Sequence, residues 1–208
     1  MELKRFAPMR IFALVVIAVL FFAACSGNHD YSPKPRGYYR IVFPKKEYQE
    51  YVSNYPFTFQ YPKYAVMTID TQTRVSPKYL NMQYLLNMQF PQFNGTLHLS
   101  YDKFTSKKMF DMLVEDARKL AFKHTIKATS IDEGTWINFP DHKVYGIYYT
   151  IDGNAASAVQ FYLTDSVKNY MRGALYFNSE PRLDSIRPVL NFVKQDVNVM
   201  IKSFRWKK

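Results

Sequence analysis

The stretch LNMQYLLNMQFPQFNGTLHLSY, residues 80–101, decides the fold because most of its apolar side chains stand at every second position. The alternation runs from the start of the stretch to Phe90 and is broken only by Leu85. A period of two places alternate side chains on one face of an extended strand. Loop residues follow at 91–95, and the alternation then resumes as far as Tyr101. The stretch predicts an antiparallel hairpin with one apolar face.

Two helices are predicted after this hairpin because the apolar positions change to a helical period. Thr105 or Ser106 can cap the first helix. Its apolar stripe consists of Met109, Leu113, Ala117, Leu120, Ala121 and His124. Asp184 can cap the second helix, and Pro188 then falls in the first turn, where its missing donor is tolerated. The second stripe consists of Ile186, Val189, Leu190, Val193, Val197, Met200, Ile201 and Phe204.

Further strand patterns flank the helices. They are residues 57–61, 135–139, 144–151, 159–163 and 170–177. Asp152, Gly153 and Asn154 lie between two of these strands and tolerate the positive φ of a turn. Together these elements predict an α+β fold, in which an antiparallel sheet carries at least two amphipathic helices.

The N-terminus has the pattern of a cleavable signal peptide. Lys4, Arg5 and Arg10 form a positive region, and residues 11–24 are an unbroken run of fourteen apolar residues. This run is typical of a signal peptide and too short to cross a bilayer comfortably as a helix. Two alanines at its end precede Cys25. The lipoprotein type of signal peptidase requires small residues before a cysteine whose sulfur accepts a diacylglycerol.

Lipidation gives the single cysteine a role. Cys25 is the only cysteine of the chain, so an exported protein has no internal disulfide to form. We predict that Cys25 is lipidated and that several acyl chains hold the protein stably at a membrane, facing the periplasm. The alternatives are an ordinary secreted protein with a chance cysteine and an uncleaved N-terminal anchor. The sequence leaves open whether the inner or the outer membrane receives the lipid.

The sequence divides into three predicted parts. Residues 1–24 are the signal peptide, residues 25–56 a lipidated, proline- and tyrosine-rich tether, and residues 57–208 a single α+β domain. The chain carries a net charge of +11. An exported lipoprotein does not routinely meet nucleic acid, so an anionic membrane, an anionic glycan or an acidic protein is the better partner. The alternative is a solvated basic surface without a dedicated partner.

No catalytic constellation is recognisable, and we expect no enzymatic activity, cofactor or small-molecule substrate. The four histidines His29, His98, His124 and His142 lack metal-ligand spacing. His98 lies between two leucines and is expected at the solvent side, whereas His142 is in a turn. The end of the first helix favours the protonated form of His124. Motifs of serine nucleophiles and glycine-rich phosphate loops are absent from the sequence.

Aromatic residues are abundant, with 17 Tyr and 17 Phe. Alternating aromatics build the core of a sheet, although tyrosines also stack on sugars or line peptide grooves. Residues 31–64 combine proline, tyrosine and lysine outside the clearest periodic segments, which suits contact with another protein. Within this stretch, Lys34, Pro35, Gly37 and Tyr38 are the candidate contact residues.

Short segments spread in order over nearly the whole mature chain carry a family resemblance. They are Pro33-Lys34-Pro35-Arg36-Gly37-Tyr38, Lys123-His124, Val144-Tyr145-Gly146, Gly153-Asn154-Ala155-Ala156-Ser157, Gln160-Phe161-Tyr162, Thr164-Asp165-Ser166, Arg172-Gly173-Ala174-Leu175-Tyr176-Phe177-Asn178 and Asp184-Ser185-Ile186 with Pro188-Val189. With these segments the sequence resembles the GldD family, the gliding-motility lipoproteins of the Bacteroidetes. The opening at residues 57–62 and the closing residues 201–204 are also similar to domains of the PsbP/Mog1 type, a likeness of fold alone.

The resemblance implies an accessory lipoprotein of the envelope machinery for gliding and the linked type IX secretion system. Its implied partners are the membrane, through the lipid on Cys25, and other envelope proteins of that machinery. It implies no enzymatic activity. The rival hypothesis is a glycan- or peptidoglycan-binding module that uses tyrosine and lysine side chains.

Overall fold

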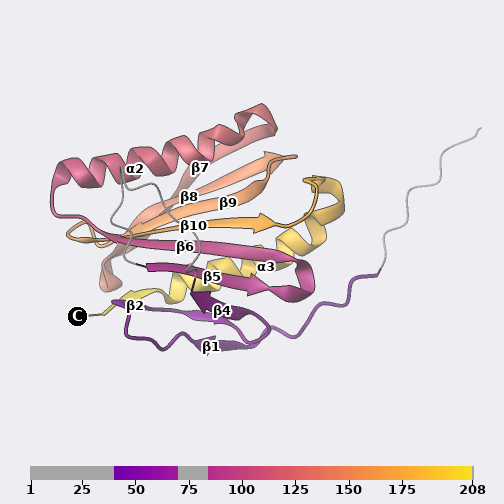
Figure 1. Ribbon diagram of the computed structural model, residues 1–208, viewed down its shortest axis with the longest axis horizontal. Coiled ribbons are helices and arrows are strands. Elements are labelled where there is room, and N and C mark those ends of the chain that lie inside the picture. The colour runs from indigo at the N-terminus through magenta and orange to yellow at the C-terminus, as the bar shows by residue number, and fades with distance from the viewer. Residues whose placement is uncertain (1–39, 70–83, 208) are drawn as a thin grey trace, which may run out of the picture. The chain divides into compact units, whose positions relative to one another are not determined.

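A seven-stranded antiparallel sheet organises the residues that the computed structural model describes, which are 40–69 and 84–207 (Figure 1). Its strand order is β4-β5-β6-β10-β9-β8-β7. The strands are β4 Val66–Ile69, β5 Tyr84–Phe90, β6 Gly95–Lys103, β7 Ala128–Phe139, β8 Val144–Gly153, β9 Ser157–Thr164 and β10 Asn169–Phe177. The predicted α+β class is confirmed.

β5 and β6 form the predicted hairpin with its apolar face in the expected register. Leu86 lies opposite Leu99, and both side chains are buried. The loop is the 3-10 turn Pro91–Phe93, and it ends at Asn94 with a φ of 49°. Asparagine tolerates this left-handed conformation better than most residues. Positions 80–83 of the predicted first strand lie outside the described residues.

The two helices lie on opposite faces of the sheet. They are α2 Lys107–Phe122 and α3 Leu183–Ser203. Consecutive residues of β10 show the division, because Tyr170 belongs to the buried cluster under α2, whereas Met171 and Leu175 belong to the cluster under α3. Figure 1 shows α3 passing behind β5 and β6. The sheet therefore has a buried core on each face.

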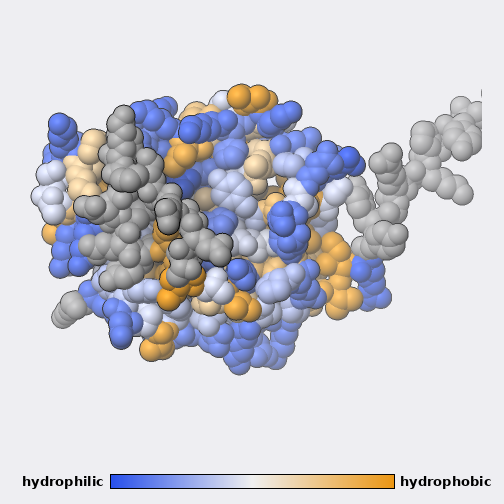
Figure 2. Space-filling model, in the orientation of Figure 1, coloured by the Kyte–Doolittle hydropathy of each residue, from blue (hydrophilic) through white to orange (hydrophobic). Residues whose placement is uncertain are grey.

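α2 begins where the sequence predicts. The Oγ of Ser106 accepts a hydrogen bond of 3.2 Å from the backbone N–H of Met109, which satisfies one of the free donors of the first turn. The helix buries Leu113, Ala117 and Ala121 of its predicted stripe. Its outer side is charged, and Figure 2 shows the surface over α2 as mainly hydrophilic.

The start of α3 corrects the prediction. The N-cap residue is Arg182 and not Asp184, and its side chain makes no capping hydrogen bond. The backbone N–H of Leu183 donates instead to Oδ1 of Asn154 at 3.0 Å, so the turn between β8 and β9 supplies the cap. Because the helix starts at Leu183, Pro188 lies beyond the first turn, where it deprives one carbonyl of a donor.

Residues 40–56 belong to the same compact unit as the sheet. Two short antiparallel sheets lie in this part of the unit: β1 Tyr48–Glu50 with β3 Gln60–Pro62, and β2 Phe57–Thr58 with β11 Arg205–Trp206. The rings of Phe57 and Phe59 stack on Phe204 with centroid distances of 5.8 and 6.2 Å. This stacking joins the beginning of the described chain to its end.

Candidate functional site at the β7 edge of the sheet

The site residues predicted near the N-terminus lie outside the described residues. These are Cys25, Lys34, Pro35, Gly37 and Tyr38.

Two kinds of feature are missing from residues 40–69 and 84–207. No group of three or more His, Cys, Asp or Glu side chains is arranged to hold a metal ion in these ranges. Neither helix there has both the length and the apolar composition that a membrane span requires.

The described histidines agree with the prediction except at His124. His98 is exposed as expected, and its Nδ1 lies 2.7 Å from Oδ1 of Asn87. His124 does not end α2 but lies in the 3-10 turn Lys123–Ile126. Burial lowers its pKa, and the positive charge of Arg172 lowers it further. The prediction of a favoured protonated form was wrong, because both causes oppose the charge.

β7 is an edge strand whose second half is uncharged and regular. Its pairing with β8 has two irregularities, both within residues 128–135. Bulges and charges of the kind found in that first half hinder pairing with a further strand. Residues 135–139 pair regularly and carry no charge. Trp136, in this second half, is 76% exposed, which is unusual for so large an apolar side chain.

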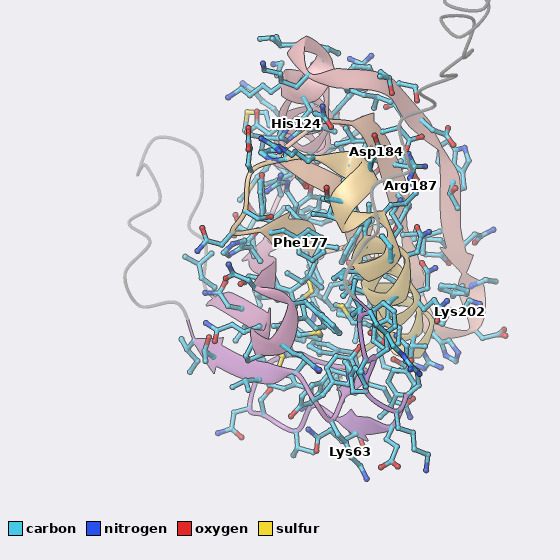
Figure 3. The ribbon with its side chains drawn as sticks, turned by 90° about the vertical axis from the view of Figure 1, so that its right-hand side faces the viewer. Lys63, His124, Phe177, Asp184, Arg187 and Lys202 are labelled. Atoms are coloured by element: carbon cyan, nitrogen blue, oxygen red, sulfur yellow. The ribbon has the colours of Figure 1, made fainter. Side chains whose placement is uncertain are left out.

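A groove of about 360 Å³ lies beside this part of the edge, between β7, β8 and α3. Ile137, Phe139 and Tyr148 give it apolar walls, and Lys194 and Lys202 line it from α3. Figure 3 shows Lys202 on α3 near the end of the long strand that runs down the right-hand side. The groove therefore combines an apolar interior with two amines.

Lys194 makes the groove suited to a negatively charged ligand. Burial lowers the pKa of its amine, Arg187 lowers it as well, and Asp152 acts in the opposite direction. The charged amine is thus poorly hydrated, and the negative charge of Asp152 offsets only part of the cost of its burial. An incoming carboxylate would favour the charged amine again, because an opposite charge nearby offsets the cost of burial.

A second polar arrangement, which the sequence analysis missed, joins the first described residues to α3. We call Asp196, Lys46, Tyr48 and Tyr64 the Asp196 cluster. Asp196 is fully buried. Its Oδ1 accepts hydrogen bonds from Lys46 Nζ at 2.7 Å and from the Tyr48 hydroxyl at 2.8 Å, and its Oδ2 accepts one from the Tyr64 hydroxyl.

Two further interactions complete the Asp196 cluster. Lys46 Nζ donates to the carbonyl oxygen of Phe192 at 2.7 Å and lies 3.5 Å from the centroid of its ring. Burial and the contact with Asp196 raise the pKa of Tyr48 to about 12, which keeps this phenol protonated as a donor. All the neighbours of the carboxylate in the cluster therefore donate hydrogen bonds to it.

The described residues define the class: a small α+β domain in which one aromatic sheet edge lies open beside a basic groove. The chain belongs to the family described as gliding motility lipoprotein GldD, whose family model matches residues 28–206. This membership confirms the resemblance and assigns the chain a role in gliding motility and attachment to a membrane by lipid. No curated protein matches the chain.

Proposed function

We propose that this protein is a non-catalytic envelope lipoprotein that supports gliding motility and type IX secretion by binding other envelope proteins. The family membership supports the motility role. The observation that carries the binding role is the open second half of β7, which exposes the side chain of Trp136 on one face of the sheet and borders the basic groove on the other. Edge strands bind extended segments through backbone hydrogen bonds, and neighbouring pockets select their side chains.

The lipid would hold this surface near a membrane, facing the periplasm. In this proposal residues 1–24 are cleaved and residues 25–56 begin with the lipid on Cys25, ahead of the domain proposed at 57–208. The fifteen residue-to-residue steps from Cys25 to Arg40 span at most about 50 Å when fully extended. The anchor would therefore restrict partners to proteins of the membrane or its close surroundings.

The Asp196 cluster supports this view of the anchor. Lys46 is held to α3 by its bond to Asp196, so this residue of the proposed tether is part of the folded unit. The proposed contact residues Lys34, Pro35, Gly37 and Tyr38 stand between lipid and domain in the sequence. They would meet partners at the membrane side, whereas the β7 edge would engage them through the domain.

Site-specific photocrosslinking in gliding cells tests the proposal. A photoreactive residue replaces Trp136, and the matched control replaces Val167, which is 71% exposed and lies outside β7. We expect a crosslink to an envelope protein required for motility from position 136 and none from position 167. The proposal fails if Trp136→Ala cells, with normal amounts of the protein, glide and secrete normally and position 136 gives no crosslink.

A second candidate function, glycan binding, is supported by the same tryptophan. An exposed indole stacks on sugar rings. On the other face of the same edge, Lys194 and Lys202 suit anionic groups of a glycan. Sedimentation with purified peptidoglycan separates the two candidates. Saturable binding that Trp136→Ala abolishes favours the glycan, whereas no binding together with the crosslink from position 136 favours the protein partner.

A further inference from the structure

A small cavity of about 70 Å³ lies on the other face of the sheet, between α2 and the strands, and it has a mainly apolar lining with a few charged and polar side chains. Ser100 and Asp102 of β6 and Tyr170 and Arg172 of β10 form its floor, and Asp116 is among the α2 residues that line it. The proposed binding at the β7 edge makes no use of these groups. Their chemistry therefore needs a separate explanation.

Asp102 supplies an unsatisfied acceptor. The residue is only 2% exposed. Its Oδ1 accepts a hydrogen bond of 2.7 Å from the backbone N–H of Lys103, whereas its buried Oδ2 has no hydrogen-bond partner. Burial raises the pKa of this carboxyl to about 6. A buried carboxylate oxygen without a donor is costly, and a ligand that donates to it would recover that free energy.

Arg172 supplies an unsatisfied donor to the same cavity. The register places Arg172 opposite Ser100, two residues along β10 from Tyr170, which is opposite Asp102. Its Nη2 donates to Oε1 of Gln160 at 2.6 Å, but its buried Nε has no hydrogen-bond partner. Asp102 and Arg172 therefore both line this small cavity, and each has one buried polar atom without a partner among the described residues.

The lining excludes several simpler ligands. A metal ion is not favoured, because no suitable group of three or more ligand side chains exists among the described residues. A ligand with a single charge would pair with only one of the two free atoms and leave the other without a partner. A ligand that carries a positive and a negative charge a short distance apart would pair with both Asp102 and Arg172.

We infer that this cavity binds a small free α-amino acid, with its ammonium group on Asp102 and its carboxylate on Arg172. Both atoms are buried, so the ligand would reach them when α2 is displaced. The ammonium would then donate to Oδ2 of Asp102, and the carboxylate would accept from Nε of Arg172. Hydrogen bonds between ionised groups are stronger than those between neutral groups. The cavity volume suits glycine or alanine, and the methyl group of alanine would meet Leu113 and Ala117.

α2 is the element that can admit this ligand. It buries three residues, Leu113, Ala117 and Ala121, of which two are alanines. α3 buries six: Leu190, Val193, Asp196, Val197, Met200 and Ile201. Elements with few buried contacts open at lower cost than the rest of a fold. A small displacement of α2 would thus expose the cavity while α3 and the β7 edge remain in place.

Titration of the lipidated protein in detergent tests the inference. The probes are glycine and alanine, with methylammonium, acetate and glycinamide as ligands that lack one charge. We expect saturable heat release and a raised melting temperature with glycine or alanine at concentrations up to about 10 mM, and neither with the incomplete ligands. No saturation by any amino acid, or an equal response to methylammonium or acetate, overturns the inference and indicates bound water only.

Substitutions identify the cavity as the site. Asp102→Asn and Arg172→Gln should each weaken binding by at least about tenfold, because each removes one charge-assisted hydrogen bond. Asp132→Asn, which removes an exposed carboxylate of β7, is the matched control and should bind normally. Unchanged binding by folded Asp102→Asn overturns the inference. The outcome is independent of crosslinking at position 136, so the two proposals can fail separately.

Discussion

Asp196 on α3 and Asp102 on β6, beneath α2, are both buried, but they differ in how many hydrogen bonds their carboxylates accept. Asp196 on α3 receives hydrogen bonds from Lys46, Tyr48 and Tyr64. Asp102 under α2 receives one backbone hydrogen bond on Oδ1, and its Oδ2 has no partner. Both residues are at most 2% exposed, so the amount of burial does not distinguish them.

The difference indicates which face is built for stability and which for binding. A buried carboxylate with a lysine and two phenols holds distant segments together, and both of its oxygens already accept hydrogen bonds. A buried carboxylate with a free oxygen beside a cavity lowers stability and retains the capacity to bind. We therefore assign a structural role to the Asp196 cluster and a ligand-binding role to the Asp102 cavity.

The largest expected effect is the loss of the Asp196 cluster. Asp196→Asn should destabilise the protein by about 3 kcal/mol or more, because it leaves the amine of Lys46 beside a neutral group and weakens the phenol bonds. Urea unfolding measures the change. Asp184→Asn is the control, since that side chain is 86% exposed, and should change stability by less than about 0.5 kcal/mol. A loss below about 1 kcal/mol for Asp196→Asn would refute the structural role.

Truncation of one leucine on each helix compares the packing of the two faces. Leu190→Ala on α3 should cost about 3–5 kcal/mol, and Leu113→Ala on α2 about 2–3 kcal/mol. Both leucines are nearly fully buried, but Leu113 already borders the cavity and has fewer contacts to lose. Urea unfolding of the two variants side by side gives the order. An equal or larger loss at Leu113 would contradict the looser packing of α2.

Asp102→Asn should have a smaller effect of opposite sign. The folded carboxyl has a pKa of about 6 against 3.8 for the ordinary group, so the folded protein binds the proton more tightly than the unfolded chain. The stability from that proton is present below about pH 4 and is lost as the pH rises through 6. Asp102→Asn should therefore stabilise the protein by about 1–2 kcal/mol at pH 7 and by little near pH 4.

Thermal unfolding at several pH values without added amino acid measures this difference. Asp132→Asn, which removes an exposed carboxylate, should leave the pH profile of wild-type stability unchanged. If Asp102→Asn destabilises the protein at pH 7, Oδ2 already has a partner such as bound water. The cavity would then lack the unsatisfied acceptor on which amino-acid binding depends.

The pattern of apolar residues predicted the strands and helices because it depends on near neighbours in the sequence. The alternation at residues 84–90 corresponds to β5, and Ser106 caps α2 as expected. The start of α3 was missed because its capping oxygen belongs to Asn154, in a turn 29 residues before Leu183. A cap from so distant a residue depends on the assembled fold.

The candidate sites were less predictable than the fold for the same reason. The partners of Asp196 lie 132 to 150 positions away. One local signal existed, because Asp196 lies three residues after Val193 and four before Met200, on the apolar stripe of its helix. A carboxylate on such a stripe indicates a buried partner. Asp102 gave no such signal, because whether its Oδ2 has a hydrogen-bond partner depends on how α2 packs over β6 in the folded protein.

The smallest effect on stability is expected at the β7 edge, outside both cores. Trp136→Ala should change the free energy of unfolding by less than about 0.5 kcal/mol, because the side chain is 76% exposed. The same variant should fail to restore gliding in cells that lack the protein. Ile137→Ala is a useful contrast, because truncating this buried side chain should lower the free energy of unfolding by about 2 kcal/mol or more.

The contrast between these neighbours separates folding from binding at one edge strand. Trp136 and Ile137 are adjacent on β7, so their side chains point to opposite faces of the sheet. Urea unfolding and the rate of spreading on agar give two independent measurements for each variant. If Trp136→Ala lowers stability as much as Ile137→Ala, its motility defect would reflect misfolding, and the open edge would no longer support a binding role.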